Sequence, residues 1–152
     1  MAEFIMKYLV KQAGVAEQFI ISSVATTTEE LANDMYPNAK AELKLHGIPF
    51  SKRQARQINN SDYEKWDLII AMDQENLSDI NHVVGNDPLK KVRLLMSFAG
   101  EENRSVSDPW YTRDFARAYN DIHRGCEAML KSLIDSDAVI DTVFDEKEHK
   151  RG

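Results

Sequence analysis

The feature of this sequence that most constrains its fold is an alternation of short apolar runs with segments that have helical features. The runs are residues 19–24, 67–72 and 92–97. Runs this short, nearly continuous in apolar residues and separated by helices, are typical of parallel strands that are buried on both faces. The sequence therefore predicts an α/β fold with three layers, α-β-α, in which a short parallel sheet is flanked by helices.

Helix signals lie between the apolar runs and after them. A helix over about residues 37–46 starts at a proline and is followed by Gly47, a residue that favours helix termination. Asp73 is placed to cap a helix over residues 74–80, and the longest helix is expected over about residues 112–134.

The sequence opens on an amphipathic helical segment that no strand precedes. Phe4, Ile5, Tyr8 and Leu9 recur at the spacing of one helix face. The first helix of an α/β domain normally follows the strand that it covers, and three parallel strands make a thin sheet. We therefore expect a further strand to belong before the first helix.

Length and composition indicate one domain and exclude several classes of partner. The 152 residues are 43% hydrophobic and 29% charged, which is enough for a single core, and we divide them into a domain over 1–134 and a tail over 135–152. The net charge of −6 argues against nucleic acid or an anionic membrane surface as the main partner. With one cysteine and no run of about 18 apolar residues, we expect a cytoplasmic protein.

Several motifs are weak individually but specific in their order. Along the chain they are Met1-Ala2-Glu3, Gly47-Ile48, Arg53-Gln54-Ala55-Arg56-Gln57-Ile58, Asp67-Leu68-Ile69-Ile70-Ala71-Met72-Asp73, Asn76-Leu77 and Asp108-Pro109-Trp110-Tyr111. In this order and spacing the sequence resembles the low-molecular-weight protein tyrosine phosphatases, over about residues 1–134.

The resemblance implies a reaction and a set of site residues. In that family a strand leads into a phosphate-binding loop of pattern Cys-x5-Arg-Ser-Pro, the cysteine attacks phosphorus, and an aspartate in an Asp-Pro-aromatic motif is general acid and base. By position the aspartate is Asp108. Trp110 and Tyr111 would form an aromatic wall against a phosphotyrosine ring, and Tyr36 would belong to another wall. The implied substrates are phosphotyrosine proteins or small aryl phosphates, and no cofactor is implied.

The resemblance starts after the loop that carries the nucleophile. The strand, the cysteine and the arginine of the family pattern are not among the 152 residues. Cys126 does not replace them, because Ser132 and not arginine stands six positions later and its helical neighbours are apolar. We interpret Cys126 as a buried structural thiol. The sequence as written is thus predicted to be inactive, and whether the protein is an enzyme stays open.

Three functional hypotheses follow. The first is a phosphatase whose start is incomplete here, with the native product beginning about 15 residues earlier, as estimated from a strand plus a loop. The second is a truncated, non-catalytic protein that binds a partner or a phosphorylated ligand. The third and weakest is arsenate reductase, which uses a related fold but needs more cysteines than Cys126.

The remaining polar motifs have structural interpretations. Asp73 and Asn76 are expected to cap a helix, and Arg56 and Gln57 to anchor a loop. His46 and His123 have no cysteine, histidine or carboxylate at a metal-ligand spacing, so no metal site is predicted.

The tail contains one further β-like run, residues 138–144. In the family's strand order, the strand that is missing here lies between the strands at 19–24 and 67–72. One hypothesis is that residues 138–144 enter this position, which would satisfy the backbone groups of both neighbours. The alternative is that the run extends the last helix.

Overall fold

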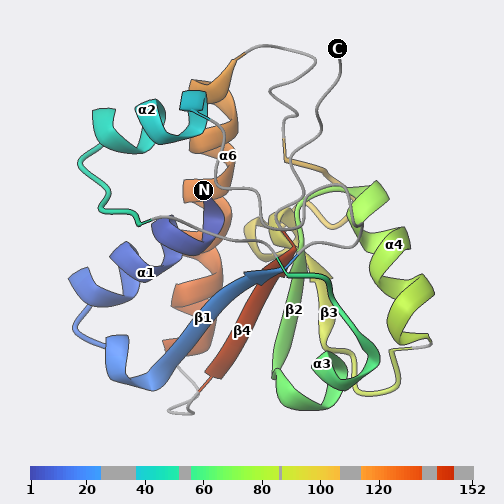
Figure 1. Cartoon of the computed structure of the whole chain (residues 1–152). Coiled ribbons are helices and arrows are strands. Elements are labelled where there is room, and N and C mark those ends of the chain that lie inside the picture. Colours follow the sequence, from blue (N-terminus) through green and yellow to red (C-terminus); the bar gives the residue numbers. More distant parts are fainter. Residues whose placement is uncertain (25–36, 52–55, 86, 107–113, 135–139, 146–152) are drawn as a thin grey trace.

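The computed structural model describes residues 1–24, 37–51, 56–85, 87–106, 114–134 and 140–145 of the chain (Figure 1). Their elements are, in chain order, α1 (Ala2–Gln12), η1 (Ala16–Gln18), β1 (Phe19–Val24), α2 (Pro37–Leu45), α3 (Asn60–Lys65), β2 (Leu68–Ala71), α4 (Gln74–Val84), β3 (Val92–Leu94), η3 (Leu95–Ala99), α6 (Phe115–Ile134) and β4 (Ile140–Asp145). The strands form one parallel sheet in the order β1-β4-β2-β3. The predicted α/β class is confirmed.

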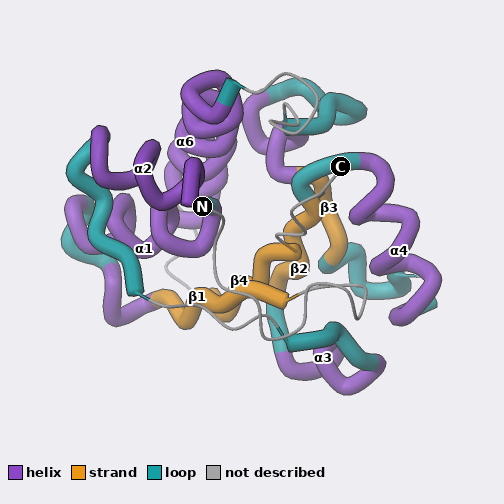
Figure 2. The backbone as a smooth tube through the Cα atoms, turned by 45° about the horizontal axis from the view of Figure 1, so that its top comes forward, coloured by secondary structure: helices purple, strands orange, loops and turns teal. Residues whose placement is uncertain are grey.

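The sheet separates two groups of helices (Figure 2). On one face, α1, α2 and α6 bury a cluster that contains Ile21 of β1, Ile70 of β2 and Phe144 of β4. On the other face, α3 and α4 cover a smaller cluster that contains Val24, Ile69 and other alternate strand residues. Because successive strand residues point to opposite faces, one short apolar run supplies both clusters. The three predicted layers follow from this alternation.

The central position beside β1 is filled by the tail. β4 pairs with β1 over six residues and with β2 over four, so that Phe144 stands opposite Ser23 on one side and Ile70 on the other. This confirms the hypothesis that the tail run enters the sheet, whereas the helical alternative is wrong for residues 140–145; residues 138 and 139 lie outside the described part. The pairing satisfies backbone groups of both neighbouring strands, which a helical tail would leave unpaired.

Other boundaries differ from the prediction for local reasons. The strand expected over 92–97 ends at Leu94, where the chain turns into η3 and the Ser97 hydroxyl donates a hydrogen bond to the Leu94 carbonyl at 2.7 Å. The helix expected over 74–80 continues to Val84 and ends at Gly85, whose φ of 78° suits glycine. The last helix, expected from about residue 112, begins at Phe115 after the non-helical Asp114, whose Oδ1 accepts a hydrogen bond from the Arg117 amide at 2.9 Å; residues 112 and 113 lie outside the described part.

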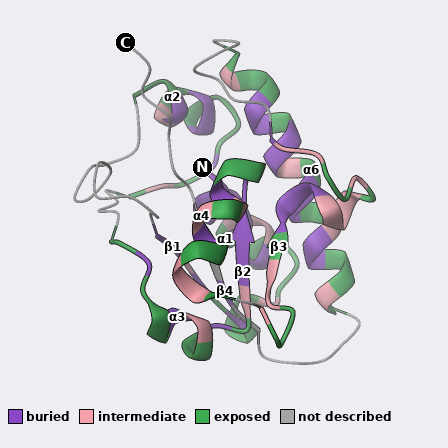
Figure 3. Cartoon of the chain, turned by 90° about the vertical axis from the view of Figure 1, so that its right-hand side faces the viewer, coloured by how far each residue is buried: buried purple, intermediate pink, exposed green. Residues whose placement is uncertain are grey.

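The longest helix, α6, is packed closely against η3. Figure 3 shows a buried stripe along α6 beside exposed residues. Gly125 lies in this stripe, and a Cβ atom there would stand 2.6 Å from Cγ of the fully buried Leu95. A glycine therefore permits an approach that any larger side chain would prevent.

The Thr142 hydroxyl of β4 supplies a prediction for stability. The residue is fully buried and its Oγ1 has no hydrogen-bond partner. Replacing Thr142 by valine exchanges that hydroxyl for a methyl group of similar size, so we expect the free energy of unfolding in urea to rise by about 1 kcal/mol. Thr142→Ser, which keeps the hydroxyl and removes the methyl group, should instead lower it. A less stable valine variant would contradict the assignment of an unpaired hydroxyl.

Candidate functional site

The four aromatic and acidic residues that the resemblance assigns to the site, Asp108, Trp110, Tyr111 and Tyr36, all lie outside the described residues. Their roles stay predictions. The structure does describe the segment that leads to Asp108, residues 100–106, and the polar contacts that hold it. These contacts show where residues 103–106 lie relative to the sheet.

The segment before Asp108 is fixed at the carboxyl end of β2. The Val106 amide donates to the Met72 carbonyl at 2.8 Å, one residue beyond the end of β2. The Gln74 amide donates to Oγ of Ser105 at 3.1 Å, and Gln74 Nε2 donates to the Asn103 carbonyl at 3.1 Å. The chain is therefore anchored two residues before Asp108, at the edge where open α/β sheets bind ligands.

A network of ion pairs ties the same segment to α6. Arg104 donates from Nη1 to Glu101 Oε2 at 2.7 Å and from Nη2 to Asp121 Oδ1 at 2.9 Å. Arg124 of α6 also donates to Glu101 Oε2, at 2.9 Å. The hydrogen bond from Arg104 holds the pKa of Glu101 below its ordinary value. The segment is thus held between β2 and α6.

The start of α4 has the geometry that the sequence predicted. The Asp73 side chain caps the helix, with its Oδ1 accepting a hydrogen bond from the Asn76 amide at 2.7 Å. The Asn76 side chain is fully buried, and neither of its polar atoms has a hydrogen-bond partner. The structural interpretation is confirmed for Asp73.

Glu3 links the first turn of α1 to the end of β1, a contact that the sequence did not indicate. Its carboxylate is buried, and it accepts hydrogen bonds from Oγ of Ser23 and from Nζ of Lys7, each at 2.6 Å. A negative charge in the first turn of a helix is stabilised by the helix dipole. The contact fixes α1 beside the carboxyl edge of the sheet.

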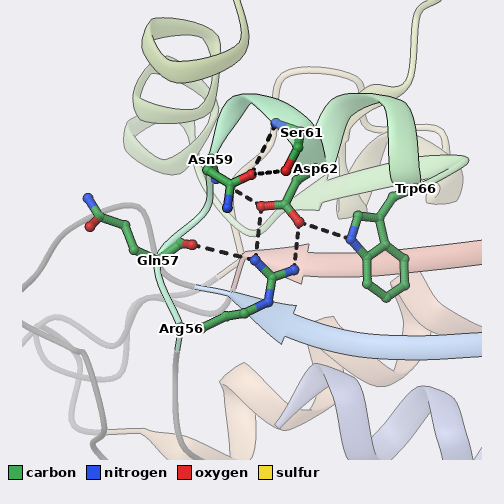
Figure 4. A network of polar contacts seen from close by, with 6 residues as sticks. All are labelled: Arg56, Gln57, Asn59, Ser61, Asp62 and Trp66. Carbon is green, nitrogen blue, oxygen red and sulfur yellow. Dashed lines mark hydrogen bonds and ion pairs between the residues drawn. The ribbon is translucent and has the colours of Figure 1, made fainter.

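Arg56 anchors a loop, as predicted, and its partner is the buried carboxylate of Asp62 (Figure 4). The guanidinium donates two hydrogen bonds, at 2.9 and 2.6 Å. The Asn59 amide and Trp66 Nε1 donate two more to the same carboxylate, at 2.8 and 3.2 Å. Arg56 Nη1 also donates to the carbonyl of Gln57 at 3.5 Å. This network joins the loop before α3 to both ends of that helix.

The helix α3 and the role of Asp62 were missed in the sequence, although a signal was present. Asn59 and Asp62 stand three residues apart and form a capping box, with Ser61 also bound to the Asn59 side chain at 3.0 Å through its amide. An acidic residue at the third helical position, here Asp62, is the sequence signal of a capping box. It was obscured because the helix has only six residues.

The pKa of Asp62 gives a prediction for acid stability. Burial by itself raises the pKa of Asp62. The hydrogen bonds from Arg56 and from the Asn59 amide together lower it by more than burial raises it, so the pKa lies below its ordinary value. The stability from this carboxylate is present above the unfolded pKa of about 4 and is lost as the pH falls through the lower folded value. Asp62→Asn should therefore unfold with a flatter pH dependence below about pH 4 in urea titrations.

The matched control for that titration is Glu17→Gln, because Glu17 is an exposed carboxylate. Its unfolding should keep the pH dependence of the parent chain. If Asp62→Asn kept the pH dependence of the parent chain at acidic pH, the loss of stability in acid could not be assigned to Asp62.

Cys126 lies in the middle of α6 and is completely buried, as predicted.

The two histidines that the sequence singled out contact other side chains. The rings of His46 and Tyr119 stack with centroids 3.7 Å apart, and His123 Nδ1 lies 3.6 Å from the carboxylate of Glu127. Within the described ranges, no group of three or more histidine, cysteine or acidic residues could hold a metal ion, and no helix is long and apolar enough to cross a membrane.

The sequence and the fold of this chain are both similar to those of known proteins. The sequence model of the family described as low molecular weight phosphotyrosine protein phosphatase matches residues 1–138. The human protein of that name is 32% identical over 136 residues, which are 86% of this chain and 84% of the relative. The crystal structure of YfkJ from Bacillus subtilis is similar with a TM-score of 0.83 and 27% identity, over 90% of this chain and 86% of that one. A low molecular weight protein tyrosine phosphatase from Streptococcus pyogenes gives a TM-score of 0.74 and 30% identity, over 87% and 82%.

Proposed function

Because the chain belongs to the low molecular weight phosphotyrosine protein phosphatase family, we propose that it recognises phosphotyrosine proteins and small aryl phosphate monoesters. In the family reaction Asp108 is the general acid that protonates the leaving phenol and then activates water. The position of Val106, two residues earlier, supports this role because its amide is bound to the Met72 carbonyl at the carboxyl edge of the sheet. Pro109 restricts Asp108 to extended backbone conformations, which suit a side chain directed into a site.

The aromatic residues of the same motif are assigned to the substrate ring. Trp110 and Tyr111 follow Asp108 directly, and Tyr36 precedes α2. Flat aromatic faces of this kind stack favourably on a phenyl phosphate. The three residues are therefore proposed to bind substrate and to have no part in bond cleavage.

The polypeptide of residues 1–152 is proposed to bind such ligands without hydrolysing them. The observation that carries this proposal is the position of its single cysteine, since Cys126 is completely buried among apolar residues of α6. The family reaction needs an exposed thiolate of low pKa that is held by backbone amides. A further supporting observation is that β4 occupies the sheet position where the resemblance places the strand before the nucleophile. The proposed compartment is the cytoplasm, because a sequence with a single cysteine forms no internal disulfide and suits reducing conditions.

An aryl phosphatase assay tests the proposal. The purified 152-residue chain should release no nitrophenol from p-nitrophenyl phosphate above the rate of Asp108→Ala. A phosphatase relative under the same conditions provides the positive control. Binding is measured separately, by titrating a phosphotyrosine peptide against the unphosphorylated peptide and following the amide resonances.

Two results would overturn these assignments. Turnover that is lost both in Asp108→Ala and on alkylation of Cys126 would make Cys126 a nucleophile. Equal resonance shifts with the two peptides would contradict recognition of the phosphate.

A further inference from the structure

The two outer strands of the sheet differ in how their backbone groups are protected. β1 stands at one edge and β3 at the other. β3 has only three residues, and neighbouring side chains bind its backbone: the Val92 amide donates to Asp87 Oδ2 at 3.0 Å, and the Leu94 carbonyl accepts from the Ser97 hydroxyl at 2.7 Å. Unpaired backbone groups at an edge would otherwise pair with another chain. The β3 edge is therefore closed to a further strand.

β1 has no comparable protection in the described part of the chain. It is six residues long, lies at the outer end of the sheet (Figure 2) and pairs with β4 alone. Among the described side chains, none forms a hydrogen bond with its backbone, and Phe19–Val24 contains no proline and no charged residue. Ile20 points away from the cluster that holds Phe19 and Ile21, and it is 59% exposed. β1 thus presents open amides and carbonyls beside an exposed apolar side chain.

The carboxyl end of β1 lies at the edge of the sheet where the ligand site is proposed. The strands are parallel, so Val24 of β1 and Ala71 of β2 end at the same edge. The carbonyl that holds Val106 belongs to Met72, the residue after Ala71. β4 stands between β1 and β2, which places their ends about 10 Å apart. A polypeptide whose phosphotyrosine reaches this edge therefore carries its neighbouring residues past the open side of β1.

We propose that β1 is a docking strand, to which the residues on one side of a phosphotyrosine add as a fifth strand. This inference rests on the proposed function and narrows its substrate class to extended segments of phosphoproteins, which bind more tightly than isolated aryl phosphates. An extended backbone is the partner because it supplies donors and acceptors in the register of an open edge. The preferred segments carry an apolar or β-branched side chain beside Ile20, since cross-strand pairs of this kind are favourable.

Methylation of peptide backbone amides gives a direct test. In an added strand, alternate amides point to the same side, so only one alternate set donates to β1. Phosphotyrosine peptides are methylated at one alternate set or at the other, on each side of the phosphotyrosine in turn, and their affinities are measured by resonance titration. On the docking side, one set should lower the affinity about tenfold and the other by no more than about twofold. Equal affinities of the two sets on both sides would overturn the proposal.

Amide hydrogen exchange in the 152-residue chain separates this proposal from the proposed function. Alternate amides of Phe19–Val24 should exchange more slowly with the phosphotyrosine peptide and at an unchanged rate with phenyl phosphate. Peptide binding without slower exchange in β1 would overturn the docking strand and leave the recognition of phosphotyrosine standing. Slower exchange that is equal with the unphosphorylated peptide would support the docking strand and contradict the recognition of phosphate. If no peptide binds, both proposals are wrong.

A substitution in β1 tests the same edge from the side of the protein. Ile20→Lys places a charge on the open edge, and lysine is a residue that discourages strand addition. The affinity for the phosphotyrosine peptide should fall by up to about fivefold, whereas that for phenyl phosphate should not change. The matched control is Leu45→Lys on α2, where the side chain is 76% exposed, and it should leave both affinities unchanged. Equal effects of the two lysines on peptide affinity would overturn the proposal.

Discussion

Replacing Phe144 by alanine is expected to lower the free energy of unfolding by about 3–5 kcal/mol. The Phe144 ring is completely buried in the central strand, in the cluster that joins the sheet to α1 and α6. The pairing strands on either side leave little room for the surrounding structure to collapse into the cavity. The loss is a large part of the roughly 5–15 kcal/mol that stabilises a typical domain. Urea unfolding followed by circular dichroism measures it.

The matched control for Phe144→Ala is Ile20→Ala on the neighbouring strand. Ile20 is 59% exposed, so its truncation should change the free energy of unfolding by about 0.5 kcal/mol or less. If Phe144→Ala also stayed within about 0.5 kcal/mol, the strand would not be part of the folded core in solution. That result would contradict the strand order given above.

Replacing Asp62 by alanine is expected to lower the free energy of unfolding by about 1–3 kcal/mol, for a different reason. The carboxylate accepts hydrogen bonds from Arg56, from the Asn59 amide and from Trp66 Nε1, and only 2% of the residue is exposed. Its removal leaves these donors without an acceptor in a partly buried region, and unpaired buried donors are expensive. Thermal and urea unfolding both measure the loss.

Glu101→Ala is the comparison for Asp62→Ala, because Glu101 also pairs with arginines but its side chain is 35% exposed. An exposed pair of this kind is screened by water and contributes little, so the loss in Glu101→Ala should be much smaller than the loss in Asp62→Ala. Equal losses in the two variants would show that burial does not decide the contribution of Asp62. A double-mutant cycle with Arg56→Ala then separates the ion pair from the other two hydrogen bonds.

The sequence predicted the α/β class because alternating apolar runs and helix caps are local signals. It could not decide the structure of residues 138–144, because the partners of β4 are about 120 residues earlier in β1 and about 70 earlier in β2. Asp141 and Asp145 also interrupt the apolar pattern of a central strand. The strand predicted for residues 95–97 was wrong because these residues form a buried 3-10 turn, and a buried turn and a buried strand have the same apolar composition.

For the candidate site, the sequence predicted single residues but not the contacts that hold the segment before Asp108. The order of motifs assigns Asp108 a role that stays a prediction, whereas the burial of Cys126 followed from its apolar helical neighbours and is confirmed. The anchor between Val106 and Met72 could not be predicted, because it joins backbone groups and has no side-chain signature. The contacts of Arg104 with Glu101 and Asp121 depend on how η3 packs against α6, which no local pattern specifies.

The strand order has a consequence for synthesis on the ribosome. A nascent chain emerges from its amino end, so β1, β2 and β3 are available before β4, which pairs between the first two. Until residue 145 has left the exit tunnel, β1 and β2 both present unpaired edges, and such edges invite association with other chains. Completion of the sheet is therefore a late, long-range step, and we expect the growing chain to depend on chaperones up to that point.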